Sequence, residues 1–491
     1  MKEYSEQELI RREKVEEIRK VCNPYPEKYD VNYSLKAASS LDDGVSDVRV
    51  AGRIIFMRKM GKLSFLKIRD LEGEIQVSIK VDCVGEDRYS FFKSNIDLGD
   101  FIGVCGEVFT TQTGEKTVRA DSFEFLGKAL RPLPEKFHGL TDIEQKYRQR
   151  YVDLITNEES RKIFLGRSKY YLFLRNYLAD NGFLEVETPI VQTSVSGASA
   201  KPVFTHYNAL DLDCNLRIAP ECYLKELVVG GYDKVFEVAK CFRNEGMDPQ
   251  HNPEFTQIEW YCAYWNFEDN INFFEKFLRD SIKFLTGSEV ITSGGSELDF
   301  SKPFERVNYI ERLTEILGFD FLRETDVDAY KAKVVDKGFF SLKDMEEYKS
   351  LAQLTDFLYK KLLRANIVGP VVMYNYPAIL KPLARRNDID PDTVDCFQVV
   401  VNGAEMCNAY SELVNPIEQK ASFEQQLEAK AQGDDETMDM DFDYLSAMEQ
   451  GMPPISGLGV GIDRLIMIAY DAPSLRDVIL FPTMKPIEKV D

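Results

Sequence analysis

The chain has 491 residues, a net charge of −21 at pH 7 and a hydrophobic content of 44%, which together predict a globular protein of two to four domains. No apolar run is long enough to span a membrane, and the charged N-terminus lacks a signal peptide. Nine scattered cysteines without Cys-x-x-Cys spacing, beside three histidines, argue against a zinc site or a disulfide framework and favour a cytoplasmic protein.

The negative charge argues against a nucleic-acid partner, but basic residues are concentrated in one N-terminal segment. Between Ala51 and Asp70 there is a single acid, and the basic residues are Arg53, Arg58, Lys59, Lys62, Lys67 and Arg69. A phosphate-binding surface is therefore expected in this part of the chain.

The first 130 residues predict a helix followed by a small β-barrel. Glu6 to Arg19 has the pattern of a charged amphipathic helix that ends before Asn23-Pro24. A five-stranded oligonucleotide-binding (OB) barrel has the size of the segment that follows, although other small barrels have it too. The expected strands are Val48–Phe56, Ser64–Arg69, Ile75–Ile79, Phe101–Thr110 and Lys116–Ala120.

A linker and a larger domain come next. Arg131-Pro132-Leu133-Pro134 predicts the linker, a long helix is expected over Glu158–Asn181 with Gly182 ending it, and a strand over Phe183–Val191. The expected organisation is an N-terminal extension (1–45), an OB-fold domain (46–128), a hinge (129–150) and a C-terminal domain (151–491) with a largely helical insertion around 270–395.

The segment around residues 235–262 predicts two antiparallel strands joined by a loop, because alternate residues on both sides are apolar. Side chains two apart on a strand share a face. One face of this hairpin would therefore carry Arg243, Glu245, Glu259 and Tyr261. Such a face indicates a binding floor, and a solvated hairpin face is the alternative.

Three further segments carry chemistry. Pro220-Glu221 predicts a helix start, which alone is weak support for a site. A strand over Glu405–Glu412 would place Asn408, Tyr410 and Glu412 on one face. Carboxylates and hydroxyl groups around one pocket suit an ammonium ligand, because a buried cation requires paired charge, whereas an exposed edge strand is the alternative.

The third segment is Gly457-Leu458-Gly459-Val460-Gly461-Ile462-Asp463-Arg464. Glycines two apart leave one strand face bare, so a flat ligand or another backbone can lie close. Arg464 would then lie in the first turn of a helix, where it adds to an anion site. There is no P-loop and no dinucleotide-binding fingerprint.

Together these motifs resemble those of the class II lysyl-tRNA synthetases over nearly the whole chain. Gly182–Pro189, Phe242–Tyr261 and Gly457–Arg464 resemble the family's motifs 1, 2 and 3. Leu383–Asp388 and Cys407–Leu413 resemble the lysyl-type signatures. The family's hinge is resembled by three ranges, Arg131–Pro134, Phe137–Leu140 and Tyr147–Tyr151. The resemblance implies an α+β fold, in which helices flank an antiparallel class II sheet and an OB-type barrel precedes it.

The resemblance also implies a function. It predicts a cytoplasmic homodimer that joins L-lysine to tRNA(Lys) through a lysyl-adenylate, with ATP as substrate and Mg²⁺ as cofactor. Two alternatives are a relative that lysylates a protein, which would lack the barrel, and an inactive RNA-binding protein.

By resemblance, the catalytic residues are Arg243, Glu245 and Arg464. Arg243 would bridge the α-phosphate and the lysine carboxylate, Glu245 would accept from the adenine amino group, and Phe255 and Arg464 would stack on the two adenine faces. His251, Asn252 and Glu405 complete the expected ATP site. The residues expected around lysine are Gly197, Glu221, Arg243, Glu259, Tyr261, Asn408, Tyr410 and Glu412.

The resemblance implies anticodon recognition by Phe65, Gln76 and Glu115. An aromatic ring offers a stacking surface, and the two polar side chains offer hydrogen bonds to base edges. For Phe65, a place in the barrel core is the alternative.

One position departs from the family pattern. The family usually has two acidic magnesium ligands seven residues apart, and here Gln398 replaces the first while Glu405 is the second. Glutamine offers a carbonyl oxygen without charge, which puts this ligand in doubt. Magnesium is therefore expected to bind through Glu405, Glu412 and ATP.

Overall fold

The computed structural model describes residues 4–134, 140, 142–198, 200–381, 384–431 and 439–487. The hinge residues Phe137-His138-Gly139 and the signature residue Leu383 lie outside this part of the chain. Two compact units are present, Met1–Asp142 and Ile143–Asp491, and each is described by itself. All nine cysteines are free. Among the described helices, none is both long and apolar enough to cross a membrane.

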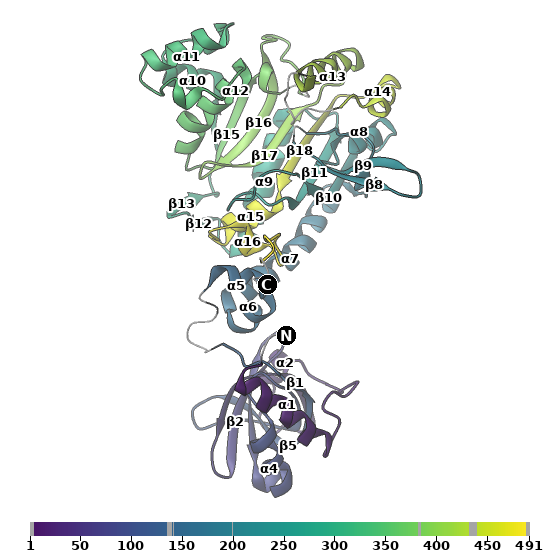
Figure 1. Cartoon of the computed structure of the whole chain (residues 1–491), viewed down its shortest axis with the longest axis vertical. Coiled ribbons are helices and arrows are strands. Elements are labelled where there is room, and N and C mark those ends of the chain that lie inside the picture. Colours follow the sequence, from purple (N-terminus) through teal and green to yellow (C-terminus); the bar gives the residue numbers. More distant parts are fainter. Residues whose placement is uncertain are drawn as a thin grey trace. The chain divides into compact units, whose positions relative to one another are not determined.

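The first unit is the predicted OB-type barrel with short helices around it (Figure 1). The strands close in the order β1-β2-β3-β5-β4. Helix α1 begins as predicted, because Ser5 and Glu8 form a reciprocal capping box. The elements are α1 (Glu6–Arg19), α2 (Leu35–Ser39), β1 (Val48–Lys59), β2 (Leu63–Arg69), β3 (Glu74–Lys80), α3 (Val81–Val84), α4 (Glu86–Asn95), β4 (Phe101–Thr110) and β5 (Lys116–Gly127).

Strict alternation along the strands separates the barrel core from its outer surface. On β2 the side chains of Ser64, Leu66 and Ile68 are buried, and the residues between them are half-buried. This period of two is what a closed barrel with a filled interior requires. The first unit therefore has its own hydrophobic core.

The second unit is built on an eight-stranded sheet in the order β14-β15-β16-β17-β18-β11-β10-β6. The central pairs are antiparallel, whereas the edge pairs β14–β15 and β10–β6 are parallel. The strands of this sheet are β6 (Leu184–Glu185), β10 (Lys234–Phe242), β11 (Glu254–Ala263), β14 (Glu305–Asn308), β15 (Val371–Pro377), β16 (Thr393–Val401), β17 (Ala404–Ser411) and β18 (Ile455–Gly461).

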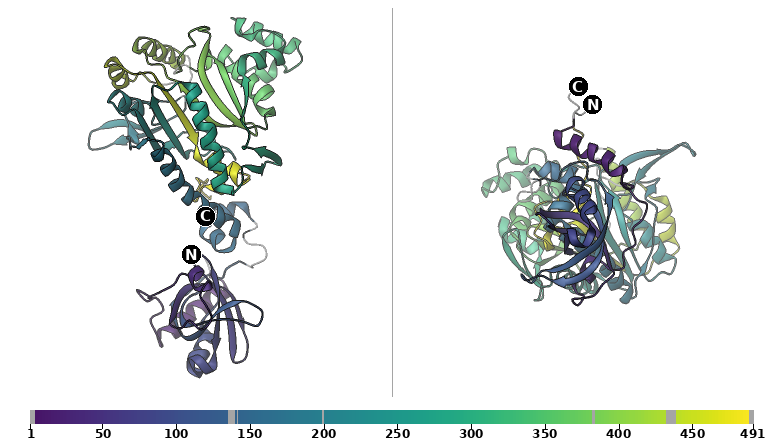
Figure 2. Two further views of the ribbon diagram at one scale, coloured as in Figure 1. Left: turned by 180° about the vertical axis from the view of Figure 1, so that it is seen from behind. Right: turned by 90° about the horizontal axis from the view of Figure 1, so that it is seen from below.

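Helices and two small sheets surround the large sheet, so the predicted α+β class is confirmed (Figures 1 and 2). The small sheets contain β7 (Val191–Gln192), β8 (Val203–Tyr207), β9 (Leu212–Leu216), β12 (Val290–Ser293) and β13 (Ser296–Asp299). The helices are α5 (Ile143–Arg148), α6 (Arg150–Thr156), α7 (Glu158–Asp180), α8 (Glu221–Val229), α9 (Phe267–Thr286), α10 (Tyr309–Leu317), α11 (Val327–Asp336), α12 (Leu351–Leu358), α13 (Pro416–Ala431), α14 (Phe442–Glu449), α15 (Ile462–Ala469) and α16 (Leu475–Val478).

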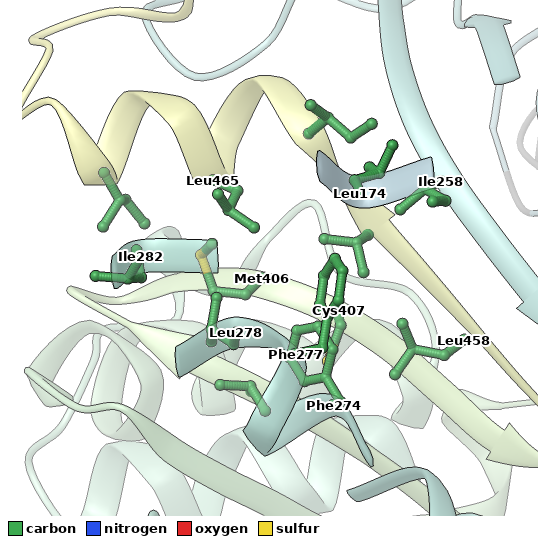
Figure 3. Packing of buried hydrophobic residues seen from close by; sticks show 14 of the residues in the cluster. Leu174, Ile258, Phe274, Phe277, Leu278, Ile282, Met406, Cys407, Leu458 and Leu465 are labelled. Atoms are coloured by element: carbon green, nitrogen blue, oxygen red, sulfur yellow. The ribbon is translucent and has the colours of Figure 1, made fainter. Parts of the chain in front are cut away.

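One face of the large sheet is covered by helices. Phe274, Phe277 and Leu278 of α9 pack against Cys407 of β17 and Leu458 of β18 (Figure 3). Residues of α7 and α15 belong to the same buried cluster. Because alternate strand residues point to opposite faces, the residues between these apolar positions are left for the other face of the sheet.

Two predicted elements differ from the structure. The strand expected over Phe183–Val191 is divided into β6 and β7, and Thr188-Pro189 lies in the break, where proline cannot donate to a sheet. The region 270–395 contains the expected helices but also β12 to β15. Strand β15 is a short apolar run buried within the sheet, and periodicity does not distinguish such a run from a helix.

Candidate active site

A cavity of about 380 Å³ lies in the second unit, over the large sheet. Its floor is formed by matched positions on neighbouring strands, with Glu259 of β11 opposite Gly459 of β18, and Gly459 opposite Asn408 of β17. The cavity is lined by every site residue predicted from this unit except Gln398, namely Gly197, Glu221, Arg243, Glu245, His251, Asn252, Phe255, Glu259, Tyr261, Glu405, Asn408, Tyr410, Glu412 and Arg464.

Two glycines of β18 make room for this arrangement. A Cβ at Gly457 would lie 2.1 Å from Cε1 of Tyr261 and 2.6 Å from Oε1 of Glu412. A Cβ at Gly459 would lie 3.4 Å from Cγ of Glu259. The predicted bare strand face is therefore occupied by side chains of the protein itself. They can lie this close to the β18 backbone only because glycine has no Cβ.

One end of the cavity is acidic. The Glu259 carboxylate accepts hydrogen bonds from Gln257 Nε2 at 2.6 Å and from the Tyr261 hydroxyl at 3.2 Å. Burial, together with the nearby Glu221 carboxylate, raises the pKa of Glu259 to about 8. Burial also raises the pKa of Glu412 to about 7, although the Lys225 ammonium opposes this shift. This end of the cavity is suited to a cation.

The other end carries two guanidinium groups. Arg243 and Glu245 lie in the loop after β10, so the prediction that they share a strand face is wrong, yet both line the cavity. The Arg243 guanidinium lies 5.1 Å from the centre of the Phe255 ring. Arg464 is in the first turn of α15, as predicted, and its Nη1 donates to the backbone oxygen of Glu405 at 2.5 Å.

Both guanidinium groups have unused hydrogen-bonding capacity. The Nε atoms of Arg243 and Arg464 are buried without a hydrogen-bond acceptor, and neither side chain has a carboxylate within ion-pair distance among the described residues. Burial lowers the pKa of Arg464, and Glu405 opposes this effect. Planar, permanently charged donors of this kind suit a ligand with several anionic oxygens.

The loop between β10 and β11 contributes two more predicted residues. The exposed His251 has its Nδ1 2.7 Å from Oδ2 of Asp248. Asn252 is buried, and its Nδ2 donates to the backbone oxygen of Glu254. Both side chains line the cavity, and each forms a hydrogen bond with a residue of the same loop or its end.

Gln257, Lys381 and Asp463 are among the polar lining residues that were given no role from the sequence. Lys381 Nζ donates to Oδ1 of Asn408 at 3.0 Å. Asp463 Oδ2 accepts from the backbone N–H of Thr256 at 2.9 Å, which ties α15 to β11. Gln257 and Asp463 belong to motifs 2 and 3. Because Gln257 is two residues before Glu259 on the same strand, this spacing could have identified Gln257 as a lining residue.

Comparison with known proteins identifies the family. The family model for class II tRNA synthetases (D, K and N) matches residues 142–485, and the model for an OB-fold nucleic acid binding domain matches residues 48–126. The chain is 47% identical over 460 residues to the lysine–tRNA ligase of Aromatoleum aromaticum, covering 93% of this chain and 90% of that protein. Identity to the enzyme of Listeria innocua is 42% over 495 residues, covering 98% of each chain. This chain belongs to the lysine–tRNA ligase family.

Gln398, which replaces the first expected metal ligand, forms hydrogen bonds within the protein. Gln398 is buried, its Oε1 accepts from the Tyr376 hydroxyl at 2.7 Å, and its Nε2 donates to Asn408 at 3.3 Å. No group of three or more His, Cys, Asp or Glu side chains in the described residues is arranged to hold a metal.

The expectation that Glu405 and Glu412 share one magnesium ion gains no support from the structure. They are separated by seven residues along an extended strand, which is roughly 20 Å at about 3.3 Å per residue. Glu412 instead lies 2.6 Å from the Lys225 ammonium in the acidic end. Glu405 is therefore the carboxylate left for a metal near the arginines.

The barrel residues expected to read the anticodon lie on its outer surface. Phe65 is half-buried and alternates with the core residue Leu66, so it is not part of the barrel core. Gln76 Nε2 donates to Thr117 Oγ1 at 2.9 Å. Glu115 pairs with Lys67 at 2.6 Å, and Lys67 is the strand partner of Gln76.

Proposed function

We propose that this chain joins L-lysine to tRNA(Lys) in two steps. In the first, a carboxylate oxygen of lysine bonds to the α-phosphorus of ATP, the bond to the β-phosphate oxygen breaks, and pyrophosphate leaves. In the second, a ribose hydroxyl of the tRNA attacks the lysyl carbonyl carbon, loses its proton and displaces AMP. Such chemistry depends on positioning and charge stabilisation more than on an acid–base pair.

The observation that carries this proposal is the opposed charge of the two ends of one cavity. Glu221 and Glu412 gather around Lys225 with Glu259 nearby, and the guanidinium groups of Arg243 and Arg464 line the same 380 Å³. Lysine has an ammonium at each end of its chain and one carboxylate, whereas ATP is a polyanion. The two substrates therefore match the two ends, and their reacting groups would meet between them.

For lysine, we assign the α-ammonium to Glu221 and the ε-ammonium to Glu412 and Tyr261. Gly197 supports this assignment, since its φ of +87° and a would-be Cβ contact of 3.2 Å with Glu221 both favour glycine beside that carboxylate. Glu259, Asn408 and Tyr410 would complete the walls of the lysine pocket.

For ATP, we assign Arg243 to the α-phosphate and the lysine carboxylate together. A guanidinium fork can hold two oxyanions at once. Glu245 would accept from the adenine amino group, with Phe255 and Arg464 on either face of the ring. His251 and Asn252, on the loop at the edge of the cavity, would contact the phosphates.

The donor set near the arginines fits a magnesium ion that is held mainly by its substrate. Mg²⁺ commonly binds one or two carboxylates together with nucleotide phosphates, and Glu405 supplies one half-buried carboxylate. Bound there, the ion would neutralise phosphate charge. Because the Gln398 carbonyl already accepts a hydrogen bond from Tyr376, we assign it no metal role.

We further propose that the barrel reads the anticodon through Phe65, Gln76 and Glu115, that the chain is a homodimer, and that it acts in the cytoplasm. The apolar side chains of Leu184, Ile190 and Val191, in and next to motif 1, are 50%, 43% and 49% exposed, which suits a surface covered by a second copy. Nine free cysteines suit a reducing compartment.

Lysine-dependent exchange of pyrophosphate into ATP tests the first step, and charging of tRNA(Lys) tests the second. We expect both activities with Mg²⁺ present. No exchange at saturating lysine, ATP and Mg²⁺ would refute the proposal and favour an inactive RNA-binding protein. Exchange without charging, together with lysylation of a protein acceptor, would favour the protein-modifying alternative.

A further inference from the structure

A lysine of the protein itself lies behind the acidic end of the cavity. Lys225 is on α8, one turn after Glu221, and is 1% exposed. Its Nζ is 2.6 Å from Oε1 of Glu221 and 2.6 Å from Oε2 of Glu412. The Tyr261 and Tyr444 rings lie 5.7 and 5.9 Å from this ammonium, within cation–π range.

The carboxylates around Lys225 keep its side chain in the charged ammonium form. Burial alone would lower the pKa of Lys225, but the carboxylates of Glu221 and Glu412 outweigh burial and raise that pKa well above its ordinary value. Both carboxylates line the cavity, whereas Lys225 is not among the lining residues. The lysine therefore acts on the cavity through the two acids.

Lys225 contacts one oxygen of each acid. Its Nζ lies 2.6 Å from Oε1 of Glu221 and 2.6 Å from Oε2 of Glu412. Both oxygens of Glu412 are buried, and neither receives a well-aligned hydrogen bond from the described residues. A buried carboxylate oxygen without a donor is costly unless a ligand supplies one.

The charge balance of this end also depends on Lys225. Glu221, Glu259 and Glu412 carry three negative charges when ionised, and Lys225 reduces their sum to two. The two ammonium groups of free lysine would balance this sum at the acidic end, and the lysine carboxylate is assigned to Arg243. Without Lys225, one carboxylate would remain unpaired in a buried site and would take up a proton.

We propose that Lys225 is a positioning residue that determines amino-acid specificity. It ties Glu221 of α8 to Glu412 at the end of β17, and so holds two carboxylates at the separation that fits an amino acid with an ammonium at both ends. This inference rests on the proposed function. The inference explains why the Lys225 ammonium is buried beside a pocket that is proposed to bind the ammonium groups of free lysine.

The test compares Lys225→Met with Lys225→Arg and a matched control. The control is Lys128→Met, because Lys128 is also fully buried between two carboxylates, at 2.5 Å from Asp97 and 2.8 Å from Asp100, but in the barrel. Pyrophosphate exchange gives KM for lysine, KM for ATP and inhibition by norleucine, which has a neutral side chain of similar length.

For Lys225→Met we expect KM for lysine to rise about 10²-fold, KM for ATP to change less than about threefold, and the preference for lysine over norleucine to fall at least about tenfold. Lys225→Arg should restore most of this preference because it keeps the charge. Lys128→Met should lower the melting temperature and leave all three exchange parameters unchanged.

An unchanged or lower KM for lysine in Lys225→Met would overturn the inference, and a lower value would show that Lys225 competes with the substrate. Equal rises in both KM values would also overturn it, because they would indicate general damage to the fold. If Lys225→Met does not fold, Lys225→Gln, which removes the charge but keeps a polar side chain, decides, and wild-type discrimination and wild-type KM for lysine in Lys225→Gln would contradict the inference. Absence of exchange in the wild-type protein would refute the proposed function instead.

Discussion

The two ends of the cavity solve opposite electrostatic problems in different ways. At the acidic end, three carboxylates are buried around a resident ammonium, and donors such as Gln257 and Tyr261 hold Glu259 in place. At the basic end, neither Arg243 nor Arg464 has a described carboxylate in ion-pair range. The acidic end therefore carries its own counter-cation, whereas the two arginines have no carboxylate partner among the described residues.

This difference matches the two substrates that we propose. A small amine has to be distinguished from neutral amino acids of similar size, which requires a site whose polar groups are left unpaired by the wrong ligand. A nucleotide triphosphate brings enough charge to pair with both arginines itself. The variants below are expected to separate these two roles.

The largest effect is expected for Arg243→Ala at the basic end. The kcat of pyrophosphate exchange should fall about 10³-fold, because a donor aimed at developing phosphate charge is lost. Folding stability should hardly change, since Nε of Arg243 has no acceptor among the described residues. Arg312→Ala, which removes a surface pair with Glu315, is the control, and a loss below tenfold for Arg243→Ala would contradict its role.

Glu412→Gln should damage the acidic end alone. KM for lysine should rise about 10²-fold while KM for ATP changes little, because one partner of a buried charge pair is removed. Glu237→Gln is a matched control, since Glu237 is buried on β10 of the same sheet and pairs with Arg217 at 2.6 Å outside the cavity lining. Equal losses for both substrates in Glu412→Gln would argue against its assignment to the ε-ammonium.

Gly457→Ala and Gly459→Ala compare two positions on the same floor. A Cβ at Gly457 would come within 2.6 Å of Oε1 of Glu412, whereas at Gly459 the nearest atom is 3.4 Å away. Overpacking of this kind costs about 1–3 kcal/mol, so Gly457→Ala should raise KM for lysine about tenfold or more. A larger effect at Gly459 would contradict the packing described here.

Phe65→Ala should affect neither end of the cavity. Loss of a stacking surface is expected to raise KM for tRNA about fivefold in the charging reaction, with pyrophosphate exchange unchanged. Phe101, which is 40% exposed on β4, provides an aromatic control on the same barrel. An exchange defect in Phe65→Ala would show that the barrel influences lysine activation in the cavity, which would contradict the assignment of Phe65 to tRNA binding alone.

The smallest effect concerns pH. Because the pKa of Glu412 is raised to about 7, its carboxyl is mostly protonated at pH 6, and the protonated form cannot form an ion pair with an ammonium. KM for lysine should fall a few-fold between pH 6 and pH 8, while KM for ATP stays level. The same raised pKa means that the folded protein binds more protons than the unfolded chain over this range, so this group's contribution to stability decreases as pH rises.

Most of the fold was predictable because its signals are local. The capping box of α1, the alternating barrel strands and the start of α8 after Pro220 depend on neighbours in sequence. The four strands within 270–395 were missed because short buried apolar runs lack a distinctive period.

The site was predictable where spacing places side chains on one strand face, as for Asn408 and Tyr410. Long-range contacts were not. Nothing near Lys225 in the sequence shows that its ammonium reaches Glu412, which is 187 residues away and meets it only after β17 joins the sheet. The same reason applies to the magnesium expectation, because the distance from Glu405 to Glu412 depends on β17 being extended.

The central claim is that the acidic end is complete before ATP binds and selects an amine. Calorimetric titration of the nucleotide-free protein with L-lysine and with L-norleucine tests this claim most directly. We predict that lysine binds without ATP and that norleucine binds at least about 10²-fold more weakly. Equal affinity for the two amino acids, or lysine binding that appears only when ATP is present, would contradict it.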